Sequence, residues 1–364
     1  MAQHYDVAVI GGGFYGGFIA YQVKHHHPRL SVVLLEREAA LFTQASATNQ
    51  GQFHRGYIYS QDRQLAAECA QNAQLFERHF PEAIDWGVAS YYGIHRESPV
   101  TPDSYEDFCA SLELPLIRVH IPESILSSQS IAAAYETTER TFSSGQLGKL
   151  IRQRLDWNDI EIHTSRRVER VEPMRHGLYQ LSLDVGGEIQ AQSVINTAFV
   201  GINDLHRRSG LPLVPTRYDL FVHFVIDLPV FLKDTAVVVI QGDYAIVMPS
   251  FSKGHVFASA AYRRLASSFD DPPTGTVTRR VLLDRFEQAQ KSCGEYAPML
   301  RSAVYRGHTL GTRAAFRGPE VQPYSSSVRF WASFAGFRNY HVLMGGKVSC
   351  LFQAVNPVLD ALAL

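Results

Sequence analysis

Residues 6–16 read DVAVIGGGFYG, and this stretch decides the fold. The apolar run 6–10 predicts a buried strand, and residues 14–24 after the glycines predict a helix. A second apolar run, SVVLL at 31–35, predicts another buried strand with Glu36 at its carboxyl end. Strand, glycine turn, helix, strand and acid in this order are typical of a βαβ unit that binds a dinucleotide.

Each part of this βαβ unit has a physical role in binding a dinucleotide. Gly11 permits the tight turn, Gly13 lets the backbone approach a pyrophosphate, and Gly16 lets the helix pack closely on the sheet. The helix N-terminus presents free N–H groups to phosphate, and we expect Glu36 to accept hydrogen bonds from ribose hydroxyls. The alternative, a glycine loop without a ligand, is disfavoured by the flanking strands. The cofactor residues predicted here are Gly11, Gly13, Phe14, Tyr15, Gly16, Glu36 and Arg37.

The composition is that of an ordinary folded protein. Its 364 residues, 46% hydrophobic and 19% charged, can form one large domain or two interleaved ones. A formal net charge of −1 leaves no basic field for nucleic acid or an anionic membrane, and four cysteines without a CxxC pair indicate neither zinc nor a disulfide framework. No apolar run reaches about 18 residues and no signal-peptide pattern begins the chain. We therefore expect a cytoplasmic protein without a metal and without a transmembrane segment.

Two kinds of sheet are predicted along the chain. Up to residue 198, strands alternate with helices, which indicates an α/β sheet with a hairpin-like excursion over 160–183. Short strands spaced by turns over 220–259 indicate an antiparallel sheet instead. Helices are predicted over 146–155, with Ser143 or Ser144 as its cap, and over 277–291 and 348–362.

Two polar segments stand out. The histidines at 25–27 resemble a metal site, but imidazoles at the end of a helix followed by Pro28 are the simpler interpretation. The segment 42–60 reads FTQASATNQGQFHRGYIYS and has almost no aliphatic residues. It has the composition of a surface loop, yet its amide groups, His54 and Tyr57 also offer many donors and acceptors to a polar ring system.

Four stretches of the chain together are similar to the D-amino-acid-oxidase superfamily of flavoenzymes, which includes glycine oxidase and L-2-hydroxyglutarate dehydrogenase. The first is the dinucleotide fingerprint with Glu36, which Rossmann flavoproteins share in general. The other three point to this superfamily: ATNQGQFHRGYIY at 47–59, the segment 142–198, and GFRNYHVLMGGKVSCLF at 336–352. The resemblance implies a non-covalently bound FAD, with adenine at the first βαβ unit and the flavin ring at a domain interface.

The resemblance also implies the domain organisation. An α/β, Rossmann-type FAD-binding domain would carry an inserted α+β substrate domain built on an antiparallel sheet. The FAD-binding domain would comprise residues 1–80, 140–205 and 326–364, and the substrate domain residues 81–139 and 206–325. The further cofactor-binding residues implied are Thr48, Asn49, Gln50, Gly51, Gln52, Val168, Thr197, Arg338, Gly345, Gly346 and Lys347.

Candidate catalytic residues come from the same resemblance. The family fixes a substrate carboxylate with an arginine, whose fork matches a carboxylate, and Arg313 and Arg338 match in position; a surface ion pair is the alternative for each. His54 is either a base or a hydrogen-bonding neighbour of the flavin, and Tyr244 and Tyr262 either line the pocket or pack in the core. The catalytic residues expected are His54, Arg313, Arg338 and Tyr262.

The function implied first is oxidation of a small amino acid or amine by hydride transfer to flavin N5, with a carboxylate-bearing amine as the expected substrate. The alternative on the same scaffold is dehydrogenation of a 2-hydroxy acid, with His54 as base; a non-enzymatic role for FAD is a third. Lys347 is expected to stabilise the anionic reduced flavin. Sarcosine-oxidase relatives activate oxygen with a lysine of the substrate-domain sheet, and Lys253 falls too early in the chain to match it. The sequence leaves the electron acceptor and the oligomeric state open.

Overall fold

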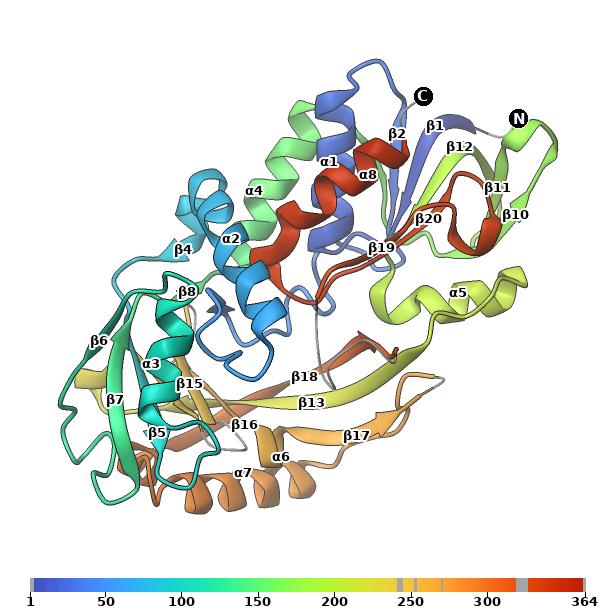
Figure 1. Ribbon diagram of the computed structural model, residues 1–364. Coiled ribbons are helices and arrows are strands. Elements are labelled where there is room, and N and C mark those ends of the chain that lie inside the picture. The colour runs from blue at the N-terminus through green and yellow to red at the C-terminus, as the bar shows by residue number, and fades with distance from the viewer. Residues whose placement is uncertain (1–2, 241–244, 252–253, 270, 319–326, 363–364) are drawn as a thin grey trace.

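The computed structural model of this chain describes residues 3–240, 245–251, 254–269, 271–318 and 327–362. Within these residues the strands form sheets of eight, nine and three strands. Figure 1 shows the eight-stranded sheet with its helices in the upper right and the nine-stranded sheet across the lower part. No described helix is both long enough and apolar enough to cross a membrane.

The eight-stranded sheet, called here the first sheet, is built on five parallel strands, β1, β2, β9, β12 and β20. An antiparallel hairpin, β10–β11, extends it beyond β12, and β19 pairs antiparallel with β20. Its strands are β1 (Gln3–Ile10), β2 (Val32–Leu35), β9 (Glu161–His163), β10 (Val168–Pro173), β11 (Tyr179–Leu183), β12 (Glu188–Asn196), β19 (Arg329–Trp331) and β20 (Tyr340–Met344). The carboxyl ends of β1, β2, β12 and β20 meet at one edge, where parallel sheets bind ligands.

Helices cover both faces of the first sheet. Alternate residues of β1 separate two cores: Val7 and Val9 pack with α1, α4 and α8, and Ala8 and Ile10 pack with α5 on the other face. The Ser143 hydroxyl caps α4 by accepting from the N–H of Gln146 at 3.1 Å. These helices are α1 (Phe14–His26), α4 (Ser144–Trp157), α5 (Ile202–Ser209) and α8 (Val355–Ala361).

The nine-stranded sheet, called the second sheet, is mostly antiparallel; its parallel pair is β5–β14. Its longest pairing joins β13 to β18 along almost their whole length. One face packs on α7 and the other on α3. Its elements are α3 (Pro102–Ala110), α6 (Ala260–Arg263), α7 (Arg279–Cys293), β5 (Ala89–His95), β6 (Leu116–Arg118), β7 (Ile131–Thr137), β13 (Thr216–Asp227), β14 (Thr235–Ile240), β15 (Ala245–Pro249), β16 (His255–Ser259), β17 (Arg264–Ser268) and β18 (Val304–Phe316).

A small three-stranded sheet joins three segments from the first half of the chain, in the order β3-β8-β4. This small sheet fixes the polar segment 42–60, called here the polar loop, because β3 lies in that loop and pairs with β8 just before α4. The remaining elements are β3 (Gln52–Phe53), β4 (Ile84–Asp85), β8 (Arg140–Phe142), α2 (Arg63–His79), η1 (Pro81–Ala83), η2 (Arg175–Gly177), η3 (Phe199–Gly201), η4 (Val230–Leu232), η5 (Pro298–Ser302), η6 (Phe334–Gly336) and η7 (Val348–Ala354).

The α/β fold class expected from the sequence is confirmed, as are the first βαβ unit and the cap at Ser143. The histidines at 25–27 lie at the end of α1, as the helix interpretation predicts. The closing helix is wrong in part, because residues 348–354 form a 3₁₀ helix before α8 begins. Strand β20 was not predicted, since its residues were assigned to a family segment without a secondary structure.

Candidate active site

A cavity of about 1160 Å³ lies between the carboxyl edge of the first sheet and the second sheet. It is lined by the turns after β1, β2, β12 and β20, by the polar loop, and by residues of β13 and β18. Segments far apart in the chain therefore meet around one space. The residues expected from the sequence that line it are Gly11, Gly13, Phe14, Tyr15, Glu36, Arg37, Thr48, Asn49, Gln50, Gly51, Gln52, His54, Val168, Thr197, Arg313, Gly345, Gly346 and Lys347.

The glycine turn after β1 excludes side chains by its geometry. Gly11 has a φ of +105°, and a Cβ on Gly16 would lie 1.8 Å from the carbonyl oxygen of Gly11. Gly13 is the N-cap of α1, where a Cβ would meet only the Ser46 Oγ, at 3.3 Å. The N–H of Phe14 donates to that Oγ at 3.0 Å. The first turn of α1 contains no acidic residue, which suits a phosphate at this helix N-terminus.

Glu36 lines the cavity directly after β2 and binds the glycine turn. Its Oε2 accepts from the N–H of Gly12 at 2.6 Å, and its Oε1 accepts from the N–H of Glu38 at 2.8 Å. Each carboxylate oxygen can accept a second hydrogen bond, so the carboxylate retains capacity for ribose hydroxyls. Arg37 is exposed and forms an ion pair with Glu38 at 3.1 Å.

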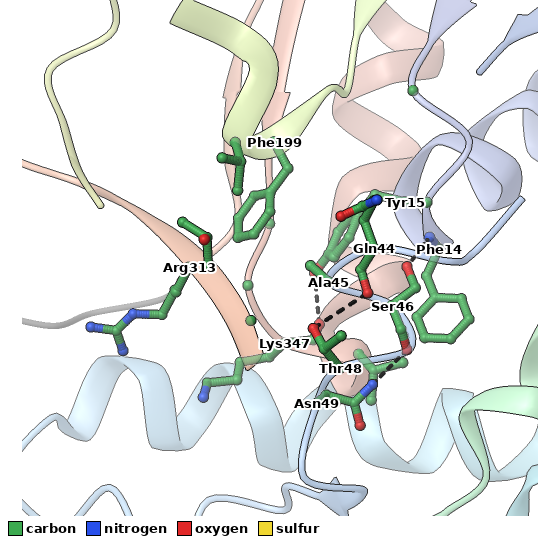
Figure 2. Close-up of a pocket in the computed structure, with 18 of the residues that line it drawn as sticks. Phe14, Tyr15, Gln44, Ala45, Ser46, Thr48, Asn49, Phe199, Arg313 and Lys347 are labelled. Atoms are coloured by element: carbon green, nitrogen blue, oxygen red, sulfur yellow. Dashed lines mark hydrogen bonds between the residues drawn. The ribbon is translucent and has the colours of Figure 1, made fainter. Parts of the chain in front are cut away.

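The polar loop is folded by hydrogen bonds among its own side chains. Asn49 Nδ2 donates to the Ser46 carbonyl at 2.6 Å and to Ser144 Oγ at 2.8 Å, which ties the loop to α4. Gln50 Nε2 donates to Gln52 Oε1 at 2.7 Å. Figure 2 shows Thr48 and Asn49 on this loop beside Lys347. The amide groups therefore order the cavity wall, in addition to any contact with a cofactor.

His54 is buried and lines the cavity. Its Nδ1 lies 3.7 Å from Glu139 Oε1, and its ring lies 5.2 Å from that of Tyr59. Burial lowers the pKa of His54 to about 4; the Lys347 charge also lowers the pKa, and the Glu139 carboxylate partly offsets this. A neutral imidazole at ordinary pH is able to accept a proton.

Glu139, which sequence analysis did not single out, is a fully buried carboxylate between β7 and β8. Burial by itself would raise its pKa, but hydrogen bonds and the neighbouring His54 hold the pKa below its ordinary value. The carboxylate accepts from the Arg55 N–H at 2.8 Å, from Gln52 Nε2 at 3.0 Å and from the Tyr92 hydroxyl. The only signal in the sequence is one acid in the polar run after β7, which many surface turns share.

Arg313 reaches the cavity from β18, next to a fully buried carboxylate on β13. Its Nη2 donates to Asp219 Oδ2 at 2.8 Å, and Asp219 also pairs with Arg217 at 2.9 Å and with Arg264 at 3.6 Å. Three guanidinium groups therefore surround one carboxylate, and of these four residues Arg313 is the one that lines the cavity. The ring of Phe221 lies 5.1 Å from the Arg313 guanidinium.

Lys347 follows β20 and faces the same space as Arg313; Figure 2 shows the two side chains coming from different elements. Burial lowers the pKa of Lys347 to about 8, and the charges of Arg313 and Arg263 contribute. Its Nζ lies 5.1 Å from the Tyr59 ring, and its carbonyl accepts from the Tyr15 hydroxyl at 2.7 Å. The lysine is thus fixed at the carboxyl end of β20.

Three expected site residues do not line this cavity: Gly16, which packs against the glycine turn, Arg338 and Tyr262. Arg338 is exposed and precedes β20, whereas the cavity lies beyond the carboxyl end of that strand. The structure therefore does not bring Arg338 to the cavity, because the family segment placed it at the correct strand but at the opposite end; its binding of substrate or cofactor stays a prediction. Tyr262 is also absent from the lining; it is half-buried and packs on the core beneath the second sheet. Tyr244 and Lys253 lie outside the described residues.

His223 is a further cavity residue that the sequence did not reveal. Its Nδ1 lies 3.1 Å from the carbonyl oxygen of Thr48, and burial lowers its pKa to about 4, aided by the charge of Arg263. His223 occurs in a run that reads as an ordinary strand. A signal was present only as polar side chains in the otherwise apolar run LFVHFVI.

Comparisons with known proteins give a consistent picture. Residues 6–349 match the family model described as FAD dependent oxidoreductase. A mitochondrial L-2-hydroxyglutarate dehydrogenase of Nematostella vectensis is 35% identical over 81 residues, which cover 22% of this chain and 18% of that protein. The match thus spans less than a fifth of that relative's length.

Solved structures match over almost the whole chain. Glycine oxidase from Geobacillus kaustophilus has a TM-score of 0.73 at 16% identity, covering 99% of this chain and 95% of that one. The L-α-glycerophosphate oxidase from Mycoplasma pneumoniae, solved with FAD bound, has a TM-score of 0.76 at 15% identity, covering 100% and 95%. At such identities the likeness shows a shared fold.

Proposed function

We propose, from the premise that the chain belongs to the family of FAD-dependent oxidoreductases, that it oxidises a small carboxylate-bearing 2-hydroxy acid to the corresponding keto acid. Oxidation of the matching amino acid is the second candidate. The hydroxy acid is placed before the amino acid because of His54, a buried and neutral imidazole in the wall of the cavity.

FAD is the cofactor of this family, and the residues of the cavity fit it. The turn Gly11–Gly13 has the positive φ and open N-cap that a pyrophosphate requires, and Glu36 stands where ribose hydroxyls are bound in Rossmann folds. Lys347 offers a positive charge that would favour an anionic reduced flavin. Bound FAD supplies the two-electron acceptor, and we propose that it is held without a covalent bond.

The positive wall around Arg313 supports a carboxylate substrate. Asp219 is shared among three guanidinium groups, of which Arg313 lines the cavity, so one carboxylate does not balance their charges and an anionic group beside Arg313 would do so. The Arg313 guanidinium offers parallel N–H donors to a carboxylate oxygen pair. We propose that Arg313 binds the substrate carboxylate and so orients the neighbouring C–H bond.

The buried His54 favours a hydroxy acid over an amino acid. A hydroxyl group must lose its proton as the carbon loses hydride, so it needs a base, whereas an uncharged amine does not. His54 is unprotonated at ordinary pH because burial and the charge of Lys347 lower its pKa. His223 is also neutral, but its Nδ1 faces a carbonyl oxygen, whereas Glu139 stands beside His54 to balance the charge formed there.

Amino acid oxidation remains the second candidate because of the same positive charges. Arg313 and Lys347 both line the cavity, and they would lower the pKa of a bound ammonium group. A neutral amine is the form that loses hydride, so these charges would assist amine oxidation without any base.

The test is anaerobic bleaching of the flavin absorbance with substrates of matched carbon skeleton. L-lactate is compared with L-alanine, and L-2-hydroxyglutarate with L-glutamate, each beside its D-isomer. We expect the hydroxy acid of a pair to bleach faster. Bleaching by amino acids alone would reverse the order of the two candidates, and no bleaching by either class would remove both.

His54→Gln sharpens the test, with His223→Gln as its matched control. Loss of a general base costs about 10²- to 10⁴-fold. We expect His54→Gln to lose that much in kcat for hydroxy acids while it retains FAD, and His223→Gln to lose less. Equal losses in the two variants would contradict the assignment of the base.

We further propose that the two large sheets correspond to two functional parts, with FAD held on the first and substrate on the second. The proposal is supported by the strands of each sheet. The first sheet takes its strands from residues 3–35, 161–196 and 329–344, and the second from 89–137 and 216–316.

A further inference from the structure

The group beside His54 that the proposed function does not yet use is Glu139. It is fully buried, and its two oxygens have different neighbours. Oε2 accepts from Gln52 Nε2 and from the Tyr92 hydroxyl, and Oε1 accepts from the Arg55 N–H and faces His54 Nδ1 at 3.7 Å. A buried carboxylate is costly unless such donors compensate for lost water, so its ionised form is built into the wall.

The His54 ring is subject to charges of both signs. Glu139 stands on the Nδ1 side, while the charges of Lys347, which precedes η7, and of Arg263 in α6 also act on the ring. Nδ1 is enclosed and has no hydrogen-bond partner at the present distance. A displacement of less than about 1 Å would bring Nδ1 and Oε1 to hydrogen-bond distance.

We infer that Glu139 is the positioning residue of His54. It takes a hydrogen bond from Nδ1–H, which leaves the Nε2 lone pair to accept the substrate hydroxyl proton, and it balances the imidazolium that forms.

The inference rests on the proposed function, and the atoms and electrons of the proposed reaction balance. The substrate alcohol loses a hydride from carbon to bound FAD and a proton from oxygen to His54 Nε2, which leaves a carbonyl group. Neutral His54 becomes a cation in a buried place, where Lys347 and Arg263 oppose it. Among the described residues around that ring, Glu139 is the adjacent anion. Its negative charge therefore stabilises the imidazolium formed by the proton transfer, rather than the cofactor.

A purely structural role is the alternative, since Glu139 also binds Tyr92, Gln52 and Arg55. Glu106 offers a matched control for that role. Its carboxylate accepts from the Tyr135 hydroxyl at 2.7 Å and pairs with Arg118, at 3.7 Å, instead of with a histidine. Glu106→Gln therefore removes a similar tyrosine contact without changing the charge at the base.

The first test needs no substrate. NMR of labelled histidine in FAD-loaded protein identifies the His54 resonance as the one missing in His54→Gln. We expect it to titrate near pH 4 in the wild type, and at lower pH or not at all in Glu139→Gln, because the carboxylate that favours the imidazolium is gone. Glu139→Asp retains the charge and should restore most of the wild-type titration if Glu139→Gln folds poorly. An unchanged titration in Glu139→Gln would overturn the inference.

The second test is kinetic. With a hydroxy acid that bleaches the flavin, we expect Glu139→Gln to lose roughly a hundredfold in kcat with KM changed less than threefold, and Glu106→Gln to stay within twofold. Adding Glu139→Gln to His54→Gln should cost little more, because the two residues act as a unit. Full additivity of the two losses would overturn the inference. Failure of every hydroxy acid to bleach the flavin would instead sink the proposed function, while the NMR titration still decides the role of Glu139.

Discussion

The positive wall, meaning here the cluster of Arg217, Arg264 and Arg313 around Asp219, reaches the cavity through Arg313. The glycine turn after β1 lines the same cavity, but the two regions are built in opposite ways. The turn is a contiguous run, residues 11–16, and its geometry is set by backbone and by the absence of Cβ atoms. The wall is made of side chains from β13, β17 and β18, which are distant in the chain. A site made of backbone can be read from consecutive residues, whereas one made of side chains exists only after the sheet has formed.

The two regions also differ in what a substitution should do. In the turn, one added methyl group meets backbone that cannot move, so binding should fail altogether. In the wall, several cations share one carboxylate, so the loss of one should weaken binding by degrees.

The largest effect is expected from Gly16→Ala. The new Cβ would lie 1.8 Å from the Gly11 carbonyl oxygen, so the turn must open and α1 must shift. We expect the purified variant to be colourless apoprotein, as measured by flavin absorbance per protein. Gly145→Ala is the matched control in the first turn of α4, where the added Cβ would be 3.9 Å from Ser143 Oγ; it should be yellow. A yellow Gly16→Ala variant would show that the backbone of the turn tolerates an added side chain, which would contradict this comparison.

The next effect is expected from Arg313→Lys. Lysine keeps the charge but loses the fork, so FAD should stay bound while affinity for a carboxylate inhibitor falls roughly ten- to a hundredfold. The measurement is titration of the flavin spectrum with the inhibitor.

Arg306→Lys is the matched control for Arg313→Lys. Arg306 lies on the same strand and pairs with Asp227 at 2.6 Å, but at the exposed end away from the cavity. We expect its inhibitor affinity to equal that of the wild type. Equal losses in both variants would show that the strand, rather than the cavity wall, was disturbed.

The contrast between these regions explains what the sequence could predict. The βαβ unit with Glu36 and the helix capped by Ser143 follow from local spacing, and the structure contains them. Glu139 and His223 could not be found in this way, because a single polar residue in a strand or turn carries no sign of what will face it. Asp219 is the same case: Arg217 lies two residues away on β13, but Arg264 and Arg313 reach Asp219 only through the pairing of β13 with β17 and β18.

A smaller effect is expected from pH, through Lys347. Burial lowers its pKa from 10.5 to about 8, so the lysine is charged below pH 8 and loses its proton as pH rises through that value. An anionic inhibitor that needs the charged form should bind roughly tenfold more weakly at pH 9 than at pH 7. Lys347→Met should bind more weakly throughout and show a flat profile. A wild-type profile that is also flat would mean that Lys347 does not face the bound anion.

The smallest effect is expected from Arg338→Ala, which tests the boundary of the site. The resemblance made Arg338 the first candidate for the carboxylate ligand, ahead of Arg313, but its side chain is exposed before β20 begins. Arg338 contributes to the fold through its backbone, because the Tyr179 hydroxyl donates to the Arg338 carbonyl at 2.8 Å. Alanine retains that carbonyl. We therefore expect FAD content and inhibitor affinity within twofold of the wild type, measured beside Arg313→Lys. A tenfold loss would mean that the segment before β20 reaches the substrate in the FAD-loaded protein. The positive wall would then include a second arginine from the first sheet, and the separation between a backbone site and a side-chain site would no longer follow the two sheets.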